Sequence, residues 1–348
     1  MPPVAPLTSQ SRRPQLAALA LSAFVAACTA PPERFADPEA AAWDQVPVTP
    51  IADAATTVDV PGAPDFLEVA SAGAAWVMNP ATASVQLVTE EGVVDEVTGV
   101  SPIGAMCQAF GSLWVASRER GTPGELVRID PARRQVLARI PAGMLGYEST
   151  LAASADHLWV LTHRRGELTV VDPGTDAVDG VVRVAPNSFG LAAGFGSIWV
   201  TSMGPAPEKG ADFGPGLLQR VDPETREVVA TIELGPMPLF LATGEGMVWV
   251  VNQGDGTVSV VDPTTDAVVR TIPLGIAGPG GDIAVGGGSV WVRASETLLT
   301  RVDPWTGAVL ARYGPQAGSG GVRAAHGVVW LSAHDTGEVW RLPAPRQD

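Results

Sequence analysis

The stretch Phe240-Leu-Ala-Thr-Gly-Glu-Gly-Met-Val-Trp249-Val-Val251 decides the fold, because close copies of it recur along the chain. Each copy has an aliphatic run, a turn of small residues, and then a tryptophan between aliphatic residues. Successive tryptophans are 38, 45, 40, 50, 42 and 39 residues apart, and they are Trp76, Trp114, Trp159, Trp199, Trp249, Trp291 and Trp330. A period near forty in strand-like sequence is typical of a β-propeller with one four-stranded blade per repeat. We therefore predict an all-β, seven-bladed propeller.

Each repeat also predicts the order of its strands. The residues before the turn form the innermost strand, and the tryptophan lies on the second. The turn has Gly at one step in six repeats and Asp156 in the third, which indicates a position with positive φ. The third strand ends at an Asp-Pro pair, a pattern that favours type I turns. We interpret these carboxylates as structural: Asp130, Asp172, Asp222, Asp262 and Asp303.

The seventh repeat runs out of chain before its outer strand, at about Leu342. Thr56 to Val60 precedes the first repeat and matches the outer strands of the others. We expect this segment to complete blade 7, which would close the ring and remove open sheet edges. The predicted propeller domain is 56–343, followed by a short tail at 344–348.

The N-terminus has the pattern of an export signal, predicted at residues 1–27. Arg12 and Arg13 precede a short apolar stretch that ends in Val25-Ala-Ala-Cys28. This ending resembles the bacterial lipobox, which implies a lipid on Cys28 and a place in the cell envelope on the extracytoplasmic side. The alternative is an ordinary secretory signal with an incidental cysteine. Residues 28–55 are rich in Ala and Pro, and we expect them to act as a tether.

The composition excludes some partners. Acidic residues outnumber basic ones 37 to 22, the net charge is −15, and Lys209 is the one lysine. Binding to a phosphate backbone needs clustered Lys and Arg, so we expect no nucleic-acid partner. Cys107 has no partner once Cys28 carries a lipid, and we interpret it as a small buried hydrophobic residue. We expect a monomer without a cofactor.

Repeat 5 carries a family resemblance. Trp249-Val-Val-Asn252, followed by Gly256-Thr-Val-Ser-Val-Val-Asp262-Pro-Thr-Thr265, resembles the bacterial YVTN-type propeller repeat. The resemblance covers roughly residues 56 to 343. It implies the fold but leaves the function open, because such propellers include enzymes, binding modules and surface proteins.

Streptogramin B lyases are enzymes of similar fold, and that likeness implies paired His and Glu residues around a magnesium ion. The pattern does not carry over. His157 and His326 fall in the turn before the tryptophan strand, on the opposite rim from such a site. His163 and His334 fall on the correct face, but in blades 3 and 7, too far apart to share a metal whose bonds to His are about 2.0–2.1 Å. We therefore predict no catalytic residue and no metal ligand.

Two sets of residues are candidates for ligand binding. The first lies in loops of variable length, since recognition usually resides on loops held by a rigid scaffold. Tolerated surface variation would produce the same lengths. These candidates for loop-face contacts come from the entry to blade 3, the insertion in blade 4 and two hairpins: Tyr147, Glu148, His163, Lys209, Phe213 and His334.

The second set consists of charges that interrupt apolar columns of the repeat alignment: Glu68, Asp282, Arg293 and Arg323. They belong to the consecutive blades 6, 7 and 1, and we expect the pairs Asp282–Arg293 and Glu68–Arg323. Buried charges are costly unless paired, so they could fasten the closure of the ring. The alternative is a charged patch at the channel mouth that binds a small polar ligand. The resulting hypothesis is a non-catalytic binding propeller that recognises an unknown protein or a small polar ligand. The alternative is a lyase-like metal enzyme using Glu68, Asp282 and His334.

Overall fold

The computed structural model describes Arg34 and residues 43–144, 150–162, 165–204, 213–275, 280–295 and 297–345. The chain divides into the units Met1–Arg34 and Phe35–Asp348, and every blade belongs to the second. Within the described residues no helix is both long enough and apolar enough to span a membrane.

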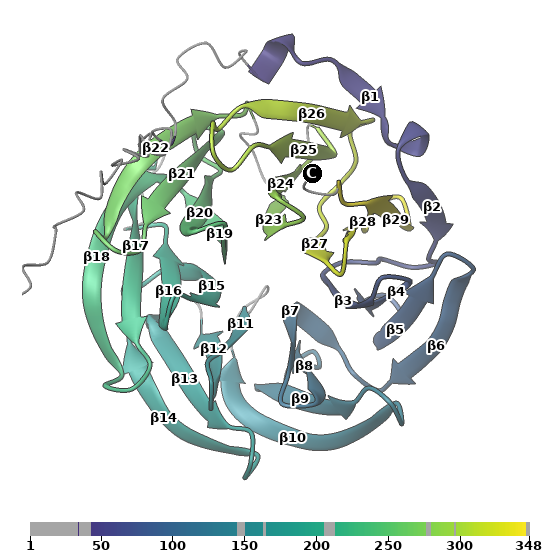
Figure 1. The fold of residues 1–348 in the computed structure, drawn as a ribbon. Helices are drawn as coiled ribbons and strands as arrows, with labels where there is room; N and C mark the ends of the chain where they lie inside the picture. The colour runs from purple at the N-terminus through teal and green to yellow at the C-terminus, as the bar shows by residue number, and fades with distance from the viewer. Residues whose placement is uncertain are drawn as a thin grey trace, which may run out of the picture. The chain divides into compact units, whose positions relative to one another are not determined.

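Seven antiparallel sheets form a ring, with the innermost strands facing the axis (Figure 1). Blade 1 consists of β3 (Leu67–Ser71), β4 (Ala74–Asn79), β5 (Ser84–Thr89) and β6 (Gly92–Thr98). Blade 2 consists of β7 (Pro102–Ala109), β8 (Ser112–Ser117), β9 (Gly124–Asp130) and β10 (Gln135–Met144). Blade 3 consists of β11 (Leu151–Ala153), β12 (Leu158–Thr162), β13 (Glu167–Asp172) and β14 (Ala177–Arg183).

The second half of the ring repeats this order. Blade 4 consists of β15 (Ser188–Gly194), β16 (Ser197–Ser202), β17 (Pro215–Asp222) and β18 (Glu227–Pro236). Blade 5 consists of β19 (Pro238–Gly244), β20 (Met247–Asn252), β21 (Thr257–Asp262) and β22 (Ala267–Pro273). Blade 6 consists of β23 (Gly281–Gly286), β24 (Ser289–Ala294), β25 (Leu299–Val302) and β26 (Val309–Gly314). Blade 7 consists of β27 (Val322–Ala325), β28 (Val328–Ala333), β29 (Glu338–Pro343) and the N-terminal β2 (Thr56–Asp59).

The predicted closure of the ring is confirmed. Strand β2 pairs antiparallel with β29, with Thr56 opposite Arg341 and Asp59 opposite Glu338. The side chains of Val58 and Val60 are buried against Trp330 and Val339. The start of the propeller is therefore held to its end by backbone hydrogen bonds and by apolar contact.

The repeated tryptophans explain why the blades stack. Each is at most 2% exposed and packs into the core of the blade that follows it. Trp199 of blade 4, for example, contacts Leu241 and Val248 of blade 5. Trp330 of blade 7 packs in the same way on Leu67 of blade 1. Burying so large a side chain at every junction makes the ring a single cooperative unit.

The tight turns confirm the glycine prediction in five blades. In blade 5, Glu245 and Gly246 have φ of 50° and 76°. Two successive left-handed residues form the type I′ turn that suits a twisted hairpin. Gly73 and Asp156 lie outside this region, so the prediction is wrong for blades 1 and 3.

The Asp-Pro carboxylates are structural, as predicted. The Oδ1 of Asp222 accepts hydrogen bonds from the backbone N–H groups of Glu224 and Thr225, at 2.8 and 3.0 Å. These hydrogen bonds lower the pKa of Asp222. The same bonding to the following N–H groups recurs at Asp130, Asp172, Asp262 and Asp303.

The prediction of a tether is wrong for residues 43–55, because these residues pack against blade 6. Strand β1 (Val48–Pro50) pairs in parallel with β26, and short 3₁₀ turns η1 (Trp43–Gln45) and η2 (Ile51–Asp53) flank it (Figure 1). The Arg312 guanidinium lies 5.0 Å from the Trp43 ring centroid and donates to the Trp43 carbonyl. The packed domain therefore includes residues 43–55, which precede the predicted start at residue 56.

Arginines also join neighbouring blades. The guanidinium of Arg220 lies over Trp199 in its own blade and donates to Ser197 at 2.8 Å. It reaches blade 5 through Pro263 O at 3.1 Å and Asp266 at 3.2 Å. Arg128 makes the equivalent contacts between blades 2 and 3.

We expect the substitution Arg220→Met to lower the free energy of unfolding by about 1–2 kcal/mol, because it removes charge-assisted hydrogen bonds that are partly open to solvent. Urea unfolding of the purified variant measures this. A loss below about 0.3 kcal/mol would show that the arginine does not hold the two blades together.

Candidate functional site

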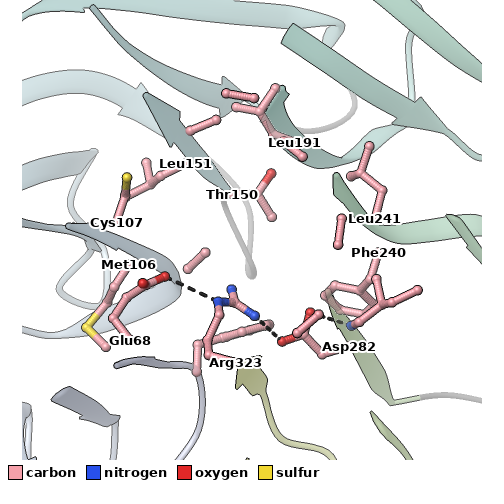
Figure 2. Close-up of a pocket in the computed structure, with 18 of the residues that line it drawn as sticks. Glu68, Met106, Cys107, Thr150, Leu151, Leu191, Phe240, Leu241, Asp282 and Arg323 are labelled. Carbon is pink, nitrogen blue, oxygen red and sulfur yellow. Dashed lines mark hydrogen bonds and ion pairs between the residues drawn. The ribbon is translucent and has the colours of Figure 1, made fainter. Parts of the chain in front are cut away.

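The innermost strands of all seven blades surround a cavity of about 460 Å³ on the axis of the ring. Figure 2 shows that its wall has two unlike sides. Met106, Leu151, Leu191 and Leu241 give an apolar side from blades 2 to 5, and the charged side chains come from blades 6, 7 and 1. This volume and mixed lining are typical of a small-molecule site.

Arg323 is the centre of the charged side. Its Nε donates to Glu68 Oε1 at 3.2 Å, and its Nη1 donates to Asp282 Oδ2 at 2.5 Å and to Val322 O at 2.7 Å (Figure 2). The three side chains come from β27, from β3 and from β23. We call Glu68, Asp282 and Arg323 the charged triad. The structure thus brings together three of the four charges that the sequence analysis singled out.

Both carboxylate oxygens of Asp282 accept hydrogen bonds, and these bonds join blades 6 and 7. Its side chain is 5% exposed. One carboxylate oxygen accepts the N–H of Ile283 at 2.9 Å, and the other accepts the N–H of Val322 at 2.9 Å in addition to Arg323. This carboxylate is a structural fastener.

Glu68 is bonded differently. Its side chain keeps 20% of its surface exposed, and within the described residues its one hydrogen-bonding partner is Arg323, through Oε1. Burial raises the pKa of Glu68, Arg323 lowers it, and Asp282 raises it, with a net rise. The carboxylate has lost water without full compensation from the protein.

Neither Arg323 nor Cys107, which lines the cavity from blade 2, offers a reactive nucleophile. Burial alone would lower the pKa of Arg323, but Asp282 and Glu68 raise it above its ordinary value, so the guanidinium stays charged. Burial and the nearby Glu68 raise the pKa of the Cys107 thiol to about 12, against the opposing effect of Arg323. The thiolate is the reactive form of cysteine, so Cys107 stays inert at neutral pH.

Arg293 is placed differently from the expectation. Asp282 and Arg293 do lie opposite each other in the strand register, but their side chains do not pair. Arg293 is fully buried and donates to Ser332 O at 3.2 Å, to Ala294 O at 2.7 Å and to Gly318 O. Burial lowers its pKa to about 10, against Asp335, Asp282 and Asp65. It fastens blade 6 to blade 7 and does not line the cavity.

Of the loop-face candidates, Phe213 is half-buried and His334 is exposed, and neither lines the cavity. Tyr147, Glu148, His163 and Lys209 lie outside the described residues, as does Cys28.

Sequence reasoning missed an aromatic cluster on the axis. Phe240 of blade 5 contacts Phe66, which precedes β3 of blade 1, with ring centroids 5.9 Å apart. It also contacts Phe189 of blade 4 edge-on at 5.3 Å. Blades 1 and 5 are not neighbours, so the rings meet across the axis, near the start of the inner strands.

The residues do not fit the magnesium site that the lyase likeness implied. The guanidinium of Arg323 lies between Glu68 and Asp282, where a shared cation would have to lie. In the described part of the chain no three His, Cys, Asp or Glu side chains are grouped so that they could hold a metal ion.

The comparisons with known proteins show the fold alone. A hydrazine synthase chain from Kuenenia stuttgartiensis aligns with a TM-score of 0.65 and 14% identity, over 82% of this chain and 96% of that one. Virginiamycin B lyase from Staphylococcus aureus aligns with a TM-score of 0.65 and 12% identity, over 83% and 98%. The computationally designed protein Ika8 aligns with a TM-score of 0.60 and 14% identity, over 83% and 99%.

No protein-family model matches the chain, and no curated protein matches it in sequence. The expected likeness in fold to streptogramin B lyases is confirmed, and the structural neighbours differ widely in function. The chain is similar to all three in being a propeller.

Proposed function

We propose that this protein is a binding propeller that takes a small ligand into the cavity on its axis and catalyses no reaction. The observation that carries the proposal is the cavity itself, which has an under-compensated carboxylate, Glu68, on one side and apolar side chains on the other. Glu68 and Arg323 keep 20% and 25% of their side-chain surface open, and both line the cavity, so a molecule inside it can reach them.

A catalytic role has less support. The Cys107 thiol stays protonated, Asp282 is held by backbone N–H groups, and Arg323 stays charged. General acid–base or nucleophilic chemistry needs a group poised to exchange a proton near the working pH together with a positioned partner. The metal-dependent alternative would require the carboxylates of Glu68 and Asp282 to release Arg323, which lies between them.

A cavity-filling variant tests binding without knowledge of the natural ligand. Ala192 lines the apolar side of the cavity, and Ala192→Phe places a ring in that space. We expect small molecules from a chemically diverse screen to raise the melting temperature of the wild type but not that of the folded variant, because ligand binding stabilises only the state that binds. Identical responses of the two proteins would contradict a site in the cavity.

We also propose that the protein is exported and held at a bacterial membrane by lipid on Cys28. The proposal rests on the lipobox-like Val25-Ala-Ala-Cys28 after the apolar stretch. We expect the wild type to incorporate labelled palmitate and to sediment with the membrane fraction, and Cys28→Ala to lose the label. Equal labelling of both proteins would contradict the assignment.

A further inference from the structure

Polar side chains of the cavity wall outside the triad donate hydrogen bonds to neighbouring blades. Thr150 Oγ1 donates to Phe189 O at 3.1 Å, and Thr243 Oγ1 donates to Ala193 O at 2.8 Å. Gln108 Nε2 donates to Val69 O at 2.9 Å. The two hydroxyls then offer a ligand only acceptor oxygens, whereas Gln108 offers its carbonyl oxygen and one remaining N–H. Acceptors outnumber donors among these three side chains, which favours a ligand that donates.

The charge on the other wall favours the same kind of ligand. Two carboxylates surround one guanidinium, so the charged triad keeps one formal negative charge. Asp65, half-buried near Asp282, also interacts with the buried Arg293, and these two opposite charges offset each other. The whole protein carries a net charge of −15, which concentrates cations around it. An anion approaching Arg323 would meet both carboxylates already bound to it.

Glu68 is the natural contact for a cationic group. Its second carboxylate oxygen has no hydrogen-bonding partner among the described residues, and the side chain faces the cavity (Figure 2). The charged or titratable groups around it are Arg323 from β27, Asp282 from β23 and Cys107 from β7. An ammonium group would restore the donors that this carboxylate lost with water.

On the basis of the binding function proposed above, we propose that the ligand is a compact organic cation. Its ammonium group bonds to the carboxylate of Glu68, and its apolar body packs on Met106, Leu151, Leu191 and Leu241. The cavity volume of about 460 Å³ lies in the range of sites for drug-sized ligands, so a hexyl group serves as a minimal probe of the apolar side.

A series of probes that share one body and differ in charge tests the ligand class. We expect n-hexylammonium to bind the wild type at pH 7.5 at least about tenfold more tightly than hexan-1-ol, a factor worth about 1.4 kcal/mol. Hexanoate should bind most weakly of the three. Calorimetric titration measures all three affinities on the full-length protein.

Two matched variants test whether Glu68 is the residue that contacts the ammonium group. We expect Glu68→Gln to remove most of the preference for hexylammonium and to leave hexan-1-ol binding nearly unchanged. Glu233→Gln, on the outer strand β18, removes the same charge far from the cavity and should behave as the wild type. Since the pKa of Glu68 is raised, hexylammonium binding should also weaken as the pH falls toward 5, because the carboxyl then takes up a proton.

Three outcomes would overturn the ligand class: tighter binding of hexanoate, equal or absent binding of all three probes, or an unchanged preference in Glu68→Gln. If Glu68→Gln fails to fold, the affinities of the three probes for the wild type still test the ligand class. If neutral or anionic compounds stabilise the wild type but not Ala192→Phe, the proposed binding function stands. Only the proposal that the ligand is an organic cation is then wrong.

Discussion

Arg323→Leu is expected to lower the free energy of unfolding by about 3–5 kcal/mol at neutral pH. Removing one partner of a buried ion pair leaves the other charge uncompensated, and here two carboxylates, Glu68 and Asp282, lose their cation. Thermal and urea unfolding of the purified variant measure the loss. The matched control is Arg183→Leu, because Arg183 pairs with Glu167 but is 74% exposed and should cost less than about 1 kcal/mol.

The loss in Arg323→Leu should depend on pH with a definite sign. Arg323 lowers the pKa of Glu68, so its removal moves that already raised pKa further up. A carboxyl with a raised pKa in the folded state destabilises the protein only where it must ionise, above the pKa of the unfolded chain. The deficit should therefore be largest near pH 8 and shrink as the pH falls toward 4. A deficit that is constant over this range would contradict the assigned environment of Glu68.

Removal of the N-terminal strands is expected to have the second large effect. A chain that begins at residue 61 lacks β1 and β2, and with them the buried side chains of Ile51, Val58 and Val60. Each fully buried aliphatic side chain contributes about 1.5–3 kcal/mol, so we expect a loss on the order of 5 kcal/mol or more. Strand β29 would also become an open edge, and we expect concentration-dependent association in size-exclusion chromatography.

Two longer chains divide this effect between the strands. A chain that begins at Trp43 keeps both β1 and β2 and should unfold as the full-length protein does. A chain that begins at Thr56 keeps β2 and should lose about 1.5–3 kcal/mol, chiefly from Ile51. Equal stability of the chains starting at 56 and 61 would contradict the closure of the ring by β2.

The fold could be predicted because one large residue marks every blade at the same step. Trp199 and Trp330 both pack against the next blade in the same way, so the spacing of the tryptophans predicts the number and length of the blades. Strand β1 could not be predicted in this way. Its pairing with β26 is parallel, lies outside the repeat, and depends on an outer edge that only the assembled blade 6 provides.

The part of the candidate site that lies within the repeat alignment could be predicted from the sequence. Glu68, Asp282 and Arg323 stood out because they replace apolar residues at positions that face the axis. The partners of Arg293 could not be predicted, since the carbonyl of Gly318 belongs to a connection outside the repeat alignment. Contact between Phe66 and Phe240 was also hidden, because it joins blades that are distant both in sequence and around the ring.

A crystal structure of the wild-type protein soaked with saturating n-hexylammonium tests most directly whether the cavity on the axis is a binding site. The account predicts one probe molecule in the cavity, with its nitrogen within about 3 Å of a Glu68 carboxylate oxygen and its alkyl chain against Leu151 and Leu191. A cavity filled by water alone at saturating probe, or a probe bound only on the outer surface, would contradict it.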